Sequence, residues 1–280
     1  LMTALVPTTG HLDLIEWAAN LPETHVHVIV NTRSFEPVCG GLRGRALQEA
    51  TAYLGNVTVY VDECDDAPQN PEDHSDFWGW WRDSINSTVP TVNGDWRYVV
   101  ASEPYGEHVA TALGAQFMPY DLNRTLNPVR GVDVRTDPIA GWEQIVRAVR
   151  EQYQLRAVMF GQESVGKTTI SKLVAERLDG TWGFEFARPY LEAVGPELSS
   201  QVMENIHAGQ AALQRKLAHA ASKPFTVLDT DLFSTVGYYG LHEYAENKRL
   251  PVDAVALKSD VYYLLPDNVP FEEEQIRYGG

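Results

Sequence analysis

The sequence has little cysteine, little positive charge and no long apolar run. Its only cysteines, Cys39 and Cys64, are too few for a disulfide framework and too far apart for a zinc knuckle. In the absence of a disulfide framework we expect a reducing compartment, and therefore a cytoplasmic protein. No apolar stretch approaches the roughly 18 residues that a membrane-spanning helix requires, and we expect no membrane partner.

The deficit of positive charge bears on the ligand. Lys and Arg number 22 against 38 Asp and Glu, which gives a net charge of −16. A nucleic-acid surface needs clustered basic residues to neutralise phosphates, so no nucleic-acid partner is expected. An acidic protein can still bind a small anion through helix N-termini, backbone amides and single basic side chains. The composition therefore favours small phosphorylated ligands over polymers.

The first half of the chain alternates strand and helix signals, as parallel βαβ units do. A polar, irregular loop is expected at 62–76. Expected strands lie at 2–6, 25–30, 57–61, 98–102 and 116–120, and expected helices at 11–19, 43–53, 77–85, 107–113 and 141–153.

A second series of the same kind follows the helix expected to end at residue 153. Its expected strands lie at 156–160, 182–186, 225–228 and 260–265, and its expected helices at 167–178 and 199–221. The sequence thus predicts two α/β domains, 1–152 and 153–280. Leu1 opens inside a strand-like segment, and 169–280 is short for a kinase domain. We therefore expect missing termini, with the second domain incomplete at its carboxyl end.

A complete phosphate-binding loop, GQESVGKT, occupies 161–168 and satisfies G-x-x-x-x-G-K-[ST]. Gly161 and Gly166 allow the backbone angles that turn the loop's N–H groups toward a triphosphate. Lys167 would reach the β- and γ-phosphates, and the Thr168 hydroxyl would ligate Mg²⁺. An expected strand before the loop and a helix after it provide the context that the motif requires. The sequence predicts an ATP-dependent phosphoryl-transfer site.

Such a site needs an acid to hold Mg²⁺ and often another to accept a proton. Asp229 and Asp231 end the apolar strand FTVLDTD, where a parallel sheet presents groups to its ligand. Glu185 ends a neighbouring expected strand, with Arg188 three residues further on. An Asp at a strand end can also simply cap a helix. Which acid is the base and which holds the metal stays open.

A weaker signal lies between the first expected strand and helix, where Thr8, Gly10 and His11 form T-x-G-H. A helix N-terminus after the first strand of a doubly wound sheet is an anion site. A His there can donate a hydrogen bond to a phosphate as charge develops. The alternative reading is a capping Thr beside a surface His.

The order of motifs along nearly the whole chain resembles the bifunctional NadR-type enzymes. These join a nicotinamide mononucleotide adenylyltransferase domain of Rossmann-like type to a P-loop ribosylnicotinamide kinase domain. In the first domain the similar positions are Thr8, Gly10 and His11 of an [H/T]-x-G-H signature, Arg43 after the second strand, Trp78 and Trp81 of a W-x-x-W segment, Ser102 of a T-S-E stretch, and Arg124 and Arg135 within 123–135.

In the second domain, GQESVGKT resembles the family's GGESSGKS loop. EFARPY at 185–190 is similar to EYGRDY, and LDTD at 228–231 is similar to IDTD. A looser match at 269–277 contains Phe271, where the family places an aromatic residue against nicotinamide.

The resemblance, together with the loop chemistry, assigns roles to individual residues. Catalytic roles fall to His11, Arg135, Lys167, Glu185, Asp229 and Asp231. Nucleotide contacts fall to Thr8, Gly10, Arg43, Ser102, Arg124, Gly161, Gly166, Thr168 and Thr169. Substrate contacts fall to Trp78, Trp81, Arg188 and Phe271, with Trp81 favoured as the ring that stacks on a flat heterocycle. The expected metal ligands are Thr168 and Asp229.

The resemblance implies NAD biosynthesis from ATP, Mg²⁺ and nicotinamide nucleosides or nucleotides, with NAD as a product. One domain would phosphorylate ribosylnicotinamide, and the other would transfer AMP to the resulting nucleotide. Arg130 and Val132 stand where relatives carry hydroxyl residues, which leaves open another nucleoside kinase fused to an inactive transferase fold. A non-catalytic NAD or ATP sensor is a further alternative. The oligomeric state is open, with a homo-oligomer as one option.

Overall fold

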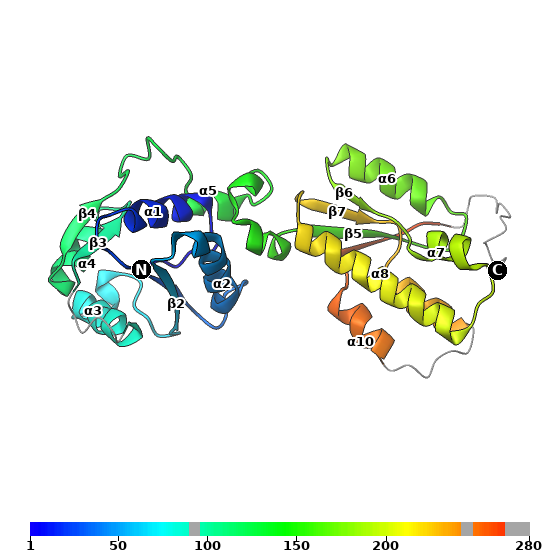
Figure 1. Ribbon diagram of the computed structural model, residues 1–280, viewed down its shortest axis with the longest axis horizontal. Coiled ribbons are helices and arrows are strands. Elements are labelled where there is room, and N and C mark those ends of the chain that lie inside the picture. Colours follow the sequence, from blue (N-terminus) through cyan, green and yellow to red (C-terminus); the bar gives the residue numbers. More distant parts are fainter. Residues whose placement is uncertain (90–95, 242–248, 267–280) are drawn as a thin grey trace. The chain divides into compact units, whose positions relative to one another are not determined.

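The computed structural model describes residues 1–89, 96–241 and 249–266 (Figure 1). The chain divides into two compact units, Leu1–Gln152 and Tyr153–Gly280, and each is described by itself. Over the described ranges, every helix is too short or too polar to cross a membrane.

The first unit alternates helices and short parallel strands. Its helices are α1 (Thr9–Ala19), α2 (Gly40–Thr51), α3 (Phe77–Thr88), α4 (Gly106–Leu113) and α5 (Gly131–Thr136). Its strands are β1 (Val26–Thr32), β2 (Val57–Glu63), β3 (Tyr98–Ala101) and β4 (Gln116–Pro119). Short 3₁₀ turns are η1 (Ala52–Leu54), η2 (Pro71–Asp73), η3 (Trp142–Gln144) and η4 (Arg147–Gln152).

The strands of the first unit form two parallel pairs among the described residues, whereas one continuous sheet was expected. β1 pairs with β2, and β3 pairs with β4. The strand expected at 2–6 contributes only an isolated bridge between Met2 and Val30. Ala4 has a φ of 42°, which lies outside extended backbone and ends the pairing. A cavity of about 280 Å³ lies between β1 and β3, lined mainly by apolar residues.

Apolar packing joins the two strand pairs. Ile29 of β1, Ile85 of α3 and Val109 of α4 belong to one buried cluster. Asp76 caps α3 by accepting a hydrogen bond from the Gly79 N–H at 3.1 Å. Consecutive burial along β1 suits a parallel strand that is covered on both faces.

The single helix expected at 141–153 is wrong, because the structure has η3 and η4 there instead. Ile145, between them, is extended and pairs with Thr8 in an isolated antiparallel bridge. The Val146 N–H also donates to the Pro7 carbonyl at 2.9 Å. The Val146 N–H therefore bonds to a residue near the start of the chain and not to its own preceding turn, as it would in a helix.

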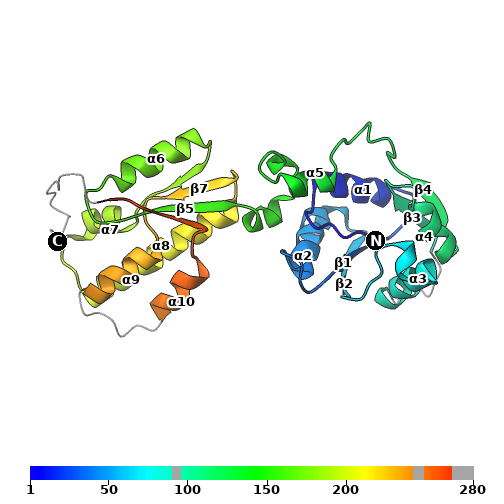
Figure 2. The same cartoon turned by 180° about the vertical axis from the view of Figure 1, so that it is seen from behind.

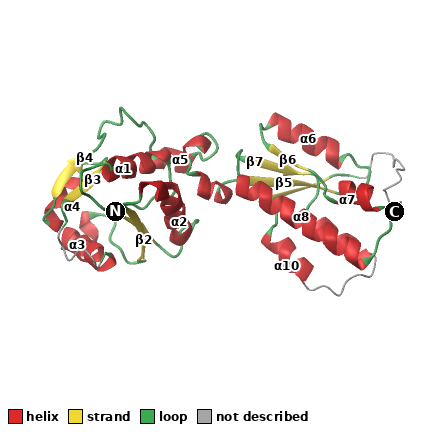
Figure 3. Ribbon diagram, viewed as in Figure 1, coloured by secondary structure: helices red, strands yellow, loops and turns green. Residues whose placement is uncertain are grey.

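The second unit has a four-stranded parallel sheet in the order β6-β7-β5-β8. The strands are β5 (Leu155–Phe160), β6 (Thr181–Gly183), β7 (Phe225–Leu228) and β8 (Val261–Leu264). The helices are α6 (Lys167–Arg177), α7 (Ala187–Val194), α8 (Ser200–Ala220), α9 (Leu232–Leu241) and α10 (Arg249–Ala256). Opposite views show α6 on one face and α8 on the other, and Figure 3 shows the layers by element type (Figures 2 and 3). An α/β fold with parallel sheets is therefore confirmed.

Two differences at the end of β6 matter for the site. The strand stops at Gly183 rather than at residue 186, and α7, which was not predicted, begins four residues later. A Cβ at Gly183 would lie 2.8 Å from Leu217 Cδ1 of α8, so a larger residue there would force neighbouring leucine side chains to shift. Glu185 consequently lies in the short connection between β6 and α7.

Candidate functional site

The loop 161–166 lies between β5 and α6 and carries three left-handed residues. Gly161 has a φ of 150°, Ser164 of 65° and Gly166 of 88°. A Cβ at Gly161 would also lie 3.1 Å from the Leu265 carbonyl oxygen. The glycines therefore allow both the angles and the close approach that the loop needs. The left-handed Ser164 was not predicted, because only glycines signal such angles in a sequence.

Lys167 is the first residue of α6, and its ammonium group turns back over the loop. Its Nζ donates to the carbonyl oxygens of Gly161 at 3.0 Å and Gln162 at 2.6 Å. Main-chain carbonyls offer partial negative charge to the cation. Phosphate oxygens carry full charge and would compete strongly for the same group. Thr169, the other predicted contact on α6, is exposed.

Thr168 and Asp229 join the loop to the end of β7. The Thr168 hydroxyl donates to Asp229 Oδ2 at 2.6 Å. Asp229 is 3% exposed, and within the described part of the chain its Oδ1 is buried without a hydrogen-bond partner. A hydroxyl and a carboxylate with one free oxygen fit Mg²⁺, which takes few protein ligands and completes its shell with phosphates and water. Within the described ranges, no group of three or more His, Cys, Asp or Glu could hold a metal alone.

The pKa values of Glu185 and Asp229 show that burial acts on both carboxyl groups. Desolvation raises the pKa of Glu185, the neighbouring Asp229 charge raises it further, and Lys167 and Arg188 oppose the rise. Desolvation also raises the pKa of Asp229, against the Thr168 hydrogen bond, Lys167 and Arg188. The charges of Lys167 and Arg188 thus act on both carboxyl groups, and the Glu163 charge adds to the rise in the pKa of Glu185. A raised pKa suits a group that must accept a proton near neutral pH.

Asp231 lies two residues beyond Asp229, and both of its carboxylate oxygens accept hydrogen bonds. Oδ1 accepts the N–H groups of Phe233 at 3.0 Å and Ser234 at 3.3 Å, at the start of α9. Oδ2 accepts the Tyr262 hydroxyl at 2.7 Å. Burial nevertheless raises the pKa of Asp231. The arrangement is that of a helix cap, in which both oxygens of Asp231 stabilise the fold.

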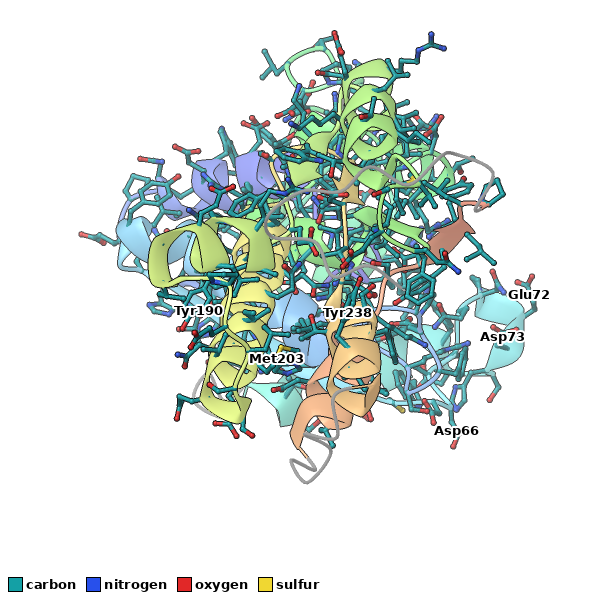
Figure 4. All side chains as sticks on the ribbon, turned by 90° about the vertical axis from the view of Figure 1, so that its right-hand side faces the viewer. Asp66, Glu72, Asp73, Tyr190, Met203 and Tyr238 are labelled. Carbon is teal, nitrogen blue, oxygen red and sulfur yellow. The ribbon has the colours of Figure 1, made fainter. Side chains whose placement is uncertain are left out.

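Glu163 is an acid of the loop that sequence reasoning did not single out. Its Oε1 accepts the Tyr238 hydroxyl of α9 at 3.2 Å. Tyr238 packs with Tyr190 of α7 and Met203 of α8, and Figure 4 labels these three side chains. The acidic residue inside the loop motif could have been noticed in the sequence. Its partner Tyr238 could not, because it lies 75 positions further along the chain.

In the first unit, Thr8 and His11 form the cap of α1. The Thr8 N–H donates to His11 Nδ1 at 3.0 Å, and the Thr8 Oγ1 lies 2.8 Å from the same nitrogen. A proton-accepting Nδ1 places the ring proton on Nε2. Burial, aided by the Arg124 charge, lowers the pKa of His11 to about 4. His11 is therefore neutral near pH 7 and can donate from Nε2.

The structure brings the T-x-G-H motif against the segment 129–131. A Cβ on Gly10 would lie 3.2 Å from the Val129 carbonyl oxygen, and one on Gly131 would lie 3.4 Å from His11 Cε1. Arg124, at a φ of 52°, donates to the Val129 carbonyl at 3.3 Å and pairs with Glu103. Two motifs separated by more than 100 residues in the sequence thus lie side by side.

Other predicted residues of the first unit lie in different surroundings. Ser102 is half-buried just after β3, and Arg135 is exposed on α5. Arg43 is fully buried, and its guanidinium group pairs with Glu36 and donates to the Thr32 hydroxyl and the Thr3 carbonyl. In this arrangement Arg43 supports the fold and presents no open face to a nucleotide.

The predicted aromatic contacts also lie in the first unit, apart from Phe271, which falls outside the described residues. Trp81 is buried at 8% exposure, with Trp80 4.8 Å away between ring centroids. Trp78 is half-buried and stacks on His108, with centroids 5.0 Å apart. A ligand ring would have to displace His108 to stack on that face of Trp78.

The geometry of the second unit defines a nucleotide-binding P-loop unit of the α/β class. A family model described as an AAA domain matches residues 156–279, which agrees with this class.

Two curated relatives and two solved structures extend the comparison to nearly the whole chain. The trifunctional NAD biosynthesis/regulator protein NadR of Salmonella typhimurium is 25% identical over 291 residues, covering 96% of this chain and 68% of the relative. The protein of the same name from Escherichia coli is 24% identical with the same coverage. The resemblance to NadR-type proteins that the motifs predicted is therefore confirmed.

The solved structures agree in fold. A crystal structure of NadR in complex with NR has a TM-score of 0.74 and 22% identity, covering 94% of this chain and 77% of the other. A second, in complex with NAD and AMP-PNP, has a TM-score of 0.73 and 22% identity, covering 94% and 79%.

Proposed function

We propose that the second unit uses ATP to phosphorylate the 5′ hydroxyl of ribosylnicotinamide. The observation that carries the proposal is the contact between Thr168 of the phosphate loop and Asp229, whose Oδ1 has no hydrogen-bond partner among the described residues. This arrangement supports nucleotide-dependent chemistry. The substrate class comes from the relatives, which are named as NAD biosynthesis proteins, and from a neighbour solved with NR.

In the proposed kinase step, the acceptor hydroxyl attacks the γ-phosphorus and ADP leaves. Glu185 accepts the hydroxyl proton, which its raised pKa suits. Lys167 exchanges the Gly161 and Gln162 carbonyls for phosphate oxygens and stabilises the charge that develops there. Thr168 and Asp229 would hold Mg²⁺, which supplies further positive charge at the phosphates.

We propose that the first unit transfers AMP from ATP to nicotinamide mononucleotide, giving NAD⁺ and pyrophosphate. The nucleotide phosphate attacks the α-phosphorus, and no covalent enzyme intermediate is required. His11, neutral and protonated on Nε2, donates a hydrogen bond to the added negative charge. Arg135 on α5 would supply positive charge once nucleotide is bound. The product of the kinase would thereby become the substrate of the transferase.

Product analysis with labelled ATP tests both steps. The chain is incubated separately with ribosylnicotinamide, nicotinamide mononucleotide and deoxynucleosides. The proposal expects nicotinamide mononucleotide and ADP from the first, and NAD⁺ and pyrophosphate from the second. Phosphorylation of deoxynucleosides in preference to ribosylnicotinamide would overturn the kinase assignment. Saturable nucleotide binding without any turnover would instead favour a sensor.

A further inference from the structure

Gln210 of α8 links two strand ends through its side-chain amide. Its Oε1 accepts the Phe186 N–H at 2.9 Å, and its Nε2 donates to the Thr230 carbonyl at 3.1 Å. Gln210 is 1% exposed, so its side-chain amide is shielded from water. One buried amide therefore satisfies two main-chain groups that belong to different strand connections.

The two main-chain partners are neighbours of the acids of the candidate kinase site. Phe186 directly follows Glu185, and Thr230 directly follows Asp229. The pairing of β6 with β7 ends at Gly183 and Leu228, and the Asp229 N–H makes a further bond to the Gly183 carbonyl at 2.8 Å. Beyond these residues the two segments separate, and Gln210 bonds to both of them.

Gly209 supports the same contact by close packing. A Cβ at this position would overlap the ring of Phe186, so only glycine lets α8 approach this closely. The Phe186 ring in turn stacks on Tyr190 of α7, with centroids 5.9 Å apart. The main chain next to Glu185 is therefore fixed by its hydrogen bond to Gln210 and by the ring packed on Gly209.

We propose that Gln210 is a positioning residue that sets the spacing of Glu185 and Asp229 across the phosphate site. The inference rests on the proposed kinase function and deepens it. Gln210 itself touches neither nucleotide nor acceptor. It acts through the main chain next to Glu185 and Asp229, where a displacement of about 1 Å can cost ~10²-fold in rate.

The test compares Gln210→Met with Gln214→Met in the full chain. Gln214 lies one turn further along α8 and is also buried, but its amide donates to the Leu257 carbonyl at 3.3 Å, away from the strand ends. Methionine keeps the unbranched shape and removes the two hydrogen bonds of the Gln210 amide or the bond from Gln214 to Leu257. Thermal unfolding of both variants reports the structural cost that each substitution carries.

For Gln210→Met we expect kcat of the kinase to fall about 10- to 100-fold with little change in KM for ATP. Gln214→Met should keep the wild-type kcat and KM. An equal fall of kcat in the two variants, or an unchanged kcat in Gln210→Met, would overturn the proposal.

Two further measurements keep the test decisive. If Gln210→Met does not fold, Gln210→Asn replaces it, because the shorter amide cannot reach both partners and should show the same fall in kcat with little change in KM for ATP. If the wild-type chain does not phosphorylate ribosylnicotinamide, the proposed function fails separately. The role of Gln210 is then measured as the Mg²⁺ concentration needed for binding of a fluorescent ATP analogue. That concentration should rise several-fold in Gln210→Met alone, and an unchanged requirement would overturn the inference.

Discussion

The Thr168 hydroxyl lies 2.6 Å from Asp229 Oδ2 and donates a hydrogen bond to it, although the two residues are 61 positions apart. The bond ties the first turn of α6 to the end of β7 and orients the carboxylate toward the loop. The other oxygen of Asp229 is buried and unpartnered within the described chain. A buried carboxylate oxygen without a hydrogen bond destabilises the fold, and a bound cation would offset that desolvation penalty.

Asp229→Asn should therefore separate activity from stability. Kinase turnover is expected to fall about 100-fold or more, because the amide supplies no charge to a metal. The melting temperature should stay the same or rise, because the substitution removes a desolvated acid whose pKa is already raised. Calorimetry beside a kinase assay measures both. A large loss of stability with activity retained would contradict the assigned role.

The raised pKa of Glu185 implies that the stability of the fold depends on pH. Its folded pKa lies above the usual carboxyl value, so the folded state holds the proton more tightly than the unfolded state. Its contribution to stability is present below the unfolded pKa and is lost as pH rises through the folded pKa. Glu185→Gln should thus stabilise the protein more at pH 7 than at pH 4, while the kinase loses its base. A stability difference that did not change with pH would contradict this.

The lowered pKa of His11 implies that its protonation state in the first unit does not change near neutral pH. Because its pKa is lowered to about 4, His11 should not titrate between pH 5.5 and 8. Nitrogen-15 NMR should show a neutral ring protonated at Nε2 throughout that range. His11→Ala should slow adenylyl transfer about 100-fold without altering kinase turnover. A His11 resonance that titrates near pH 6.5 would rule out the neutral donor.

Arg43 and Glu36 form a buried pair whose removal should affect stability. Arg43→Met leaves Glu36 without its partner and is expected to cost about 3–5 kcal/mol. Glu36→Gln combined with Arg43→Met should recover part of that loss. Chemical denaturation of both single variants and the double variant gives the coupling energy. Additive losses would show that the pair is not coupled, and a specific rise in KM for ATP would restore the nucleotide-binding role.

The second unit was more predictable from sequence than the first. Its loop motif and apolar strands are local signals, and the strands predicted at 156–160 and 225–228 match β5 and β7 almost residue for residue. α7, α9 and α10 were missed, because their signals are short and neighbouring residues supply their packing. The sequence predicted Glu185 and Asp229 at the ends of two strands; Asp229 directly follows β7, whereas Glu185 lies two residues beyond the end of β6.

The first unit was harder to predict because tertiary contacts override its local patterns. The apolar spacing of 141–153 suggests a helix, yet Ile145 pairs with Thr8, more than 130 residues earlier. The resemblance assigned Arg43 a nucleotide contact, but Glu36 lies seven positions before it and pairs with it in the core. Gln210 carried no signal, since one glutamine on a helix does not indicate two main-chain partners.

Lys167→Ala provides the most direct test of the central claim, that the loop 161–168 carries phosphoryl transfer. Labelled ATP is supplied with ribosylnicotinamide in one reaction and with nicotinamide mononucleotide in another, and products are resolved for wild type and variant. We predict that the variant loses formation of nicotinamide mononucleotide by at least about 100-fold and still forms NAD⁺ at the wild-type rate. Undiminished formation of nicotinamide mononucleotide in the variant would contradict the account.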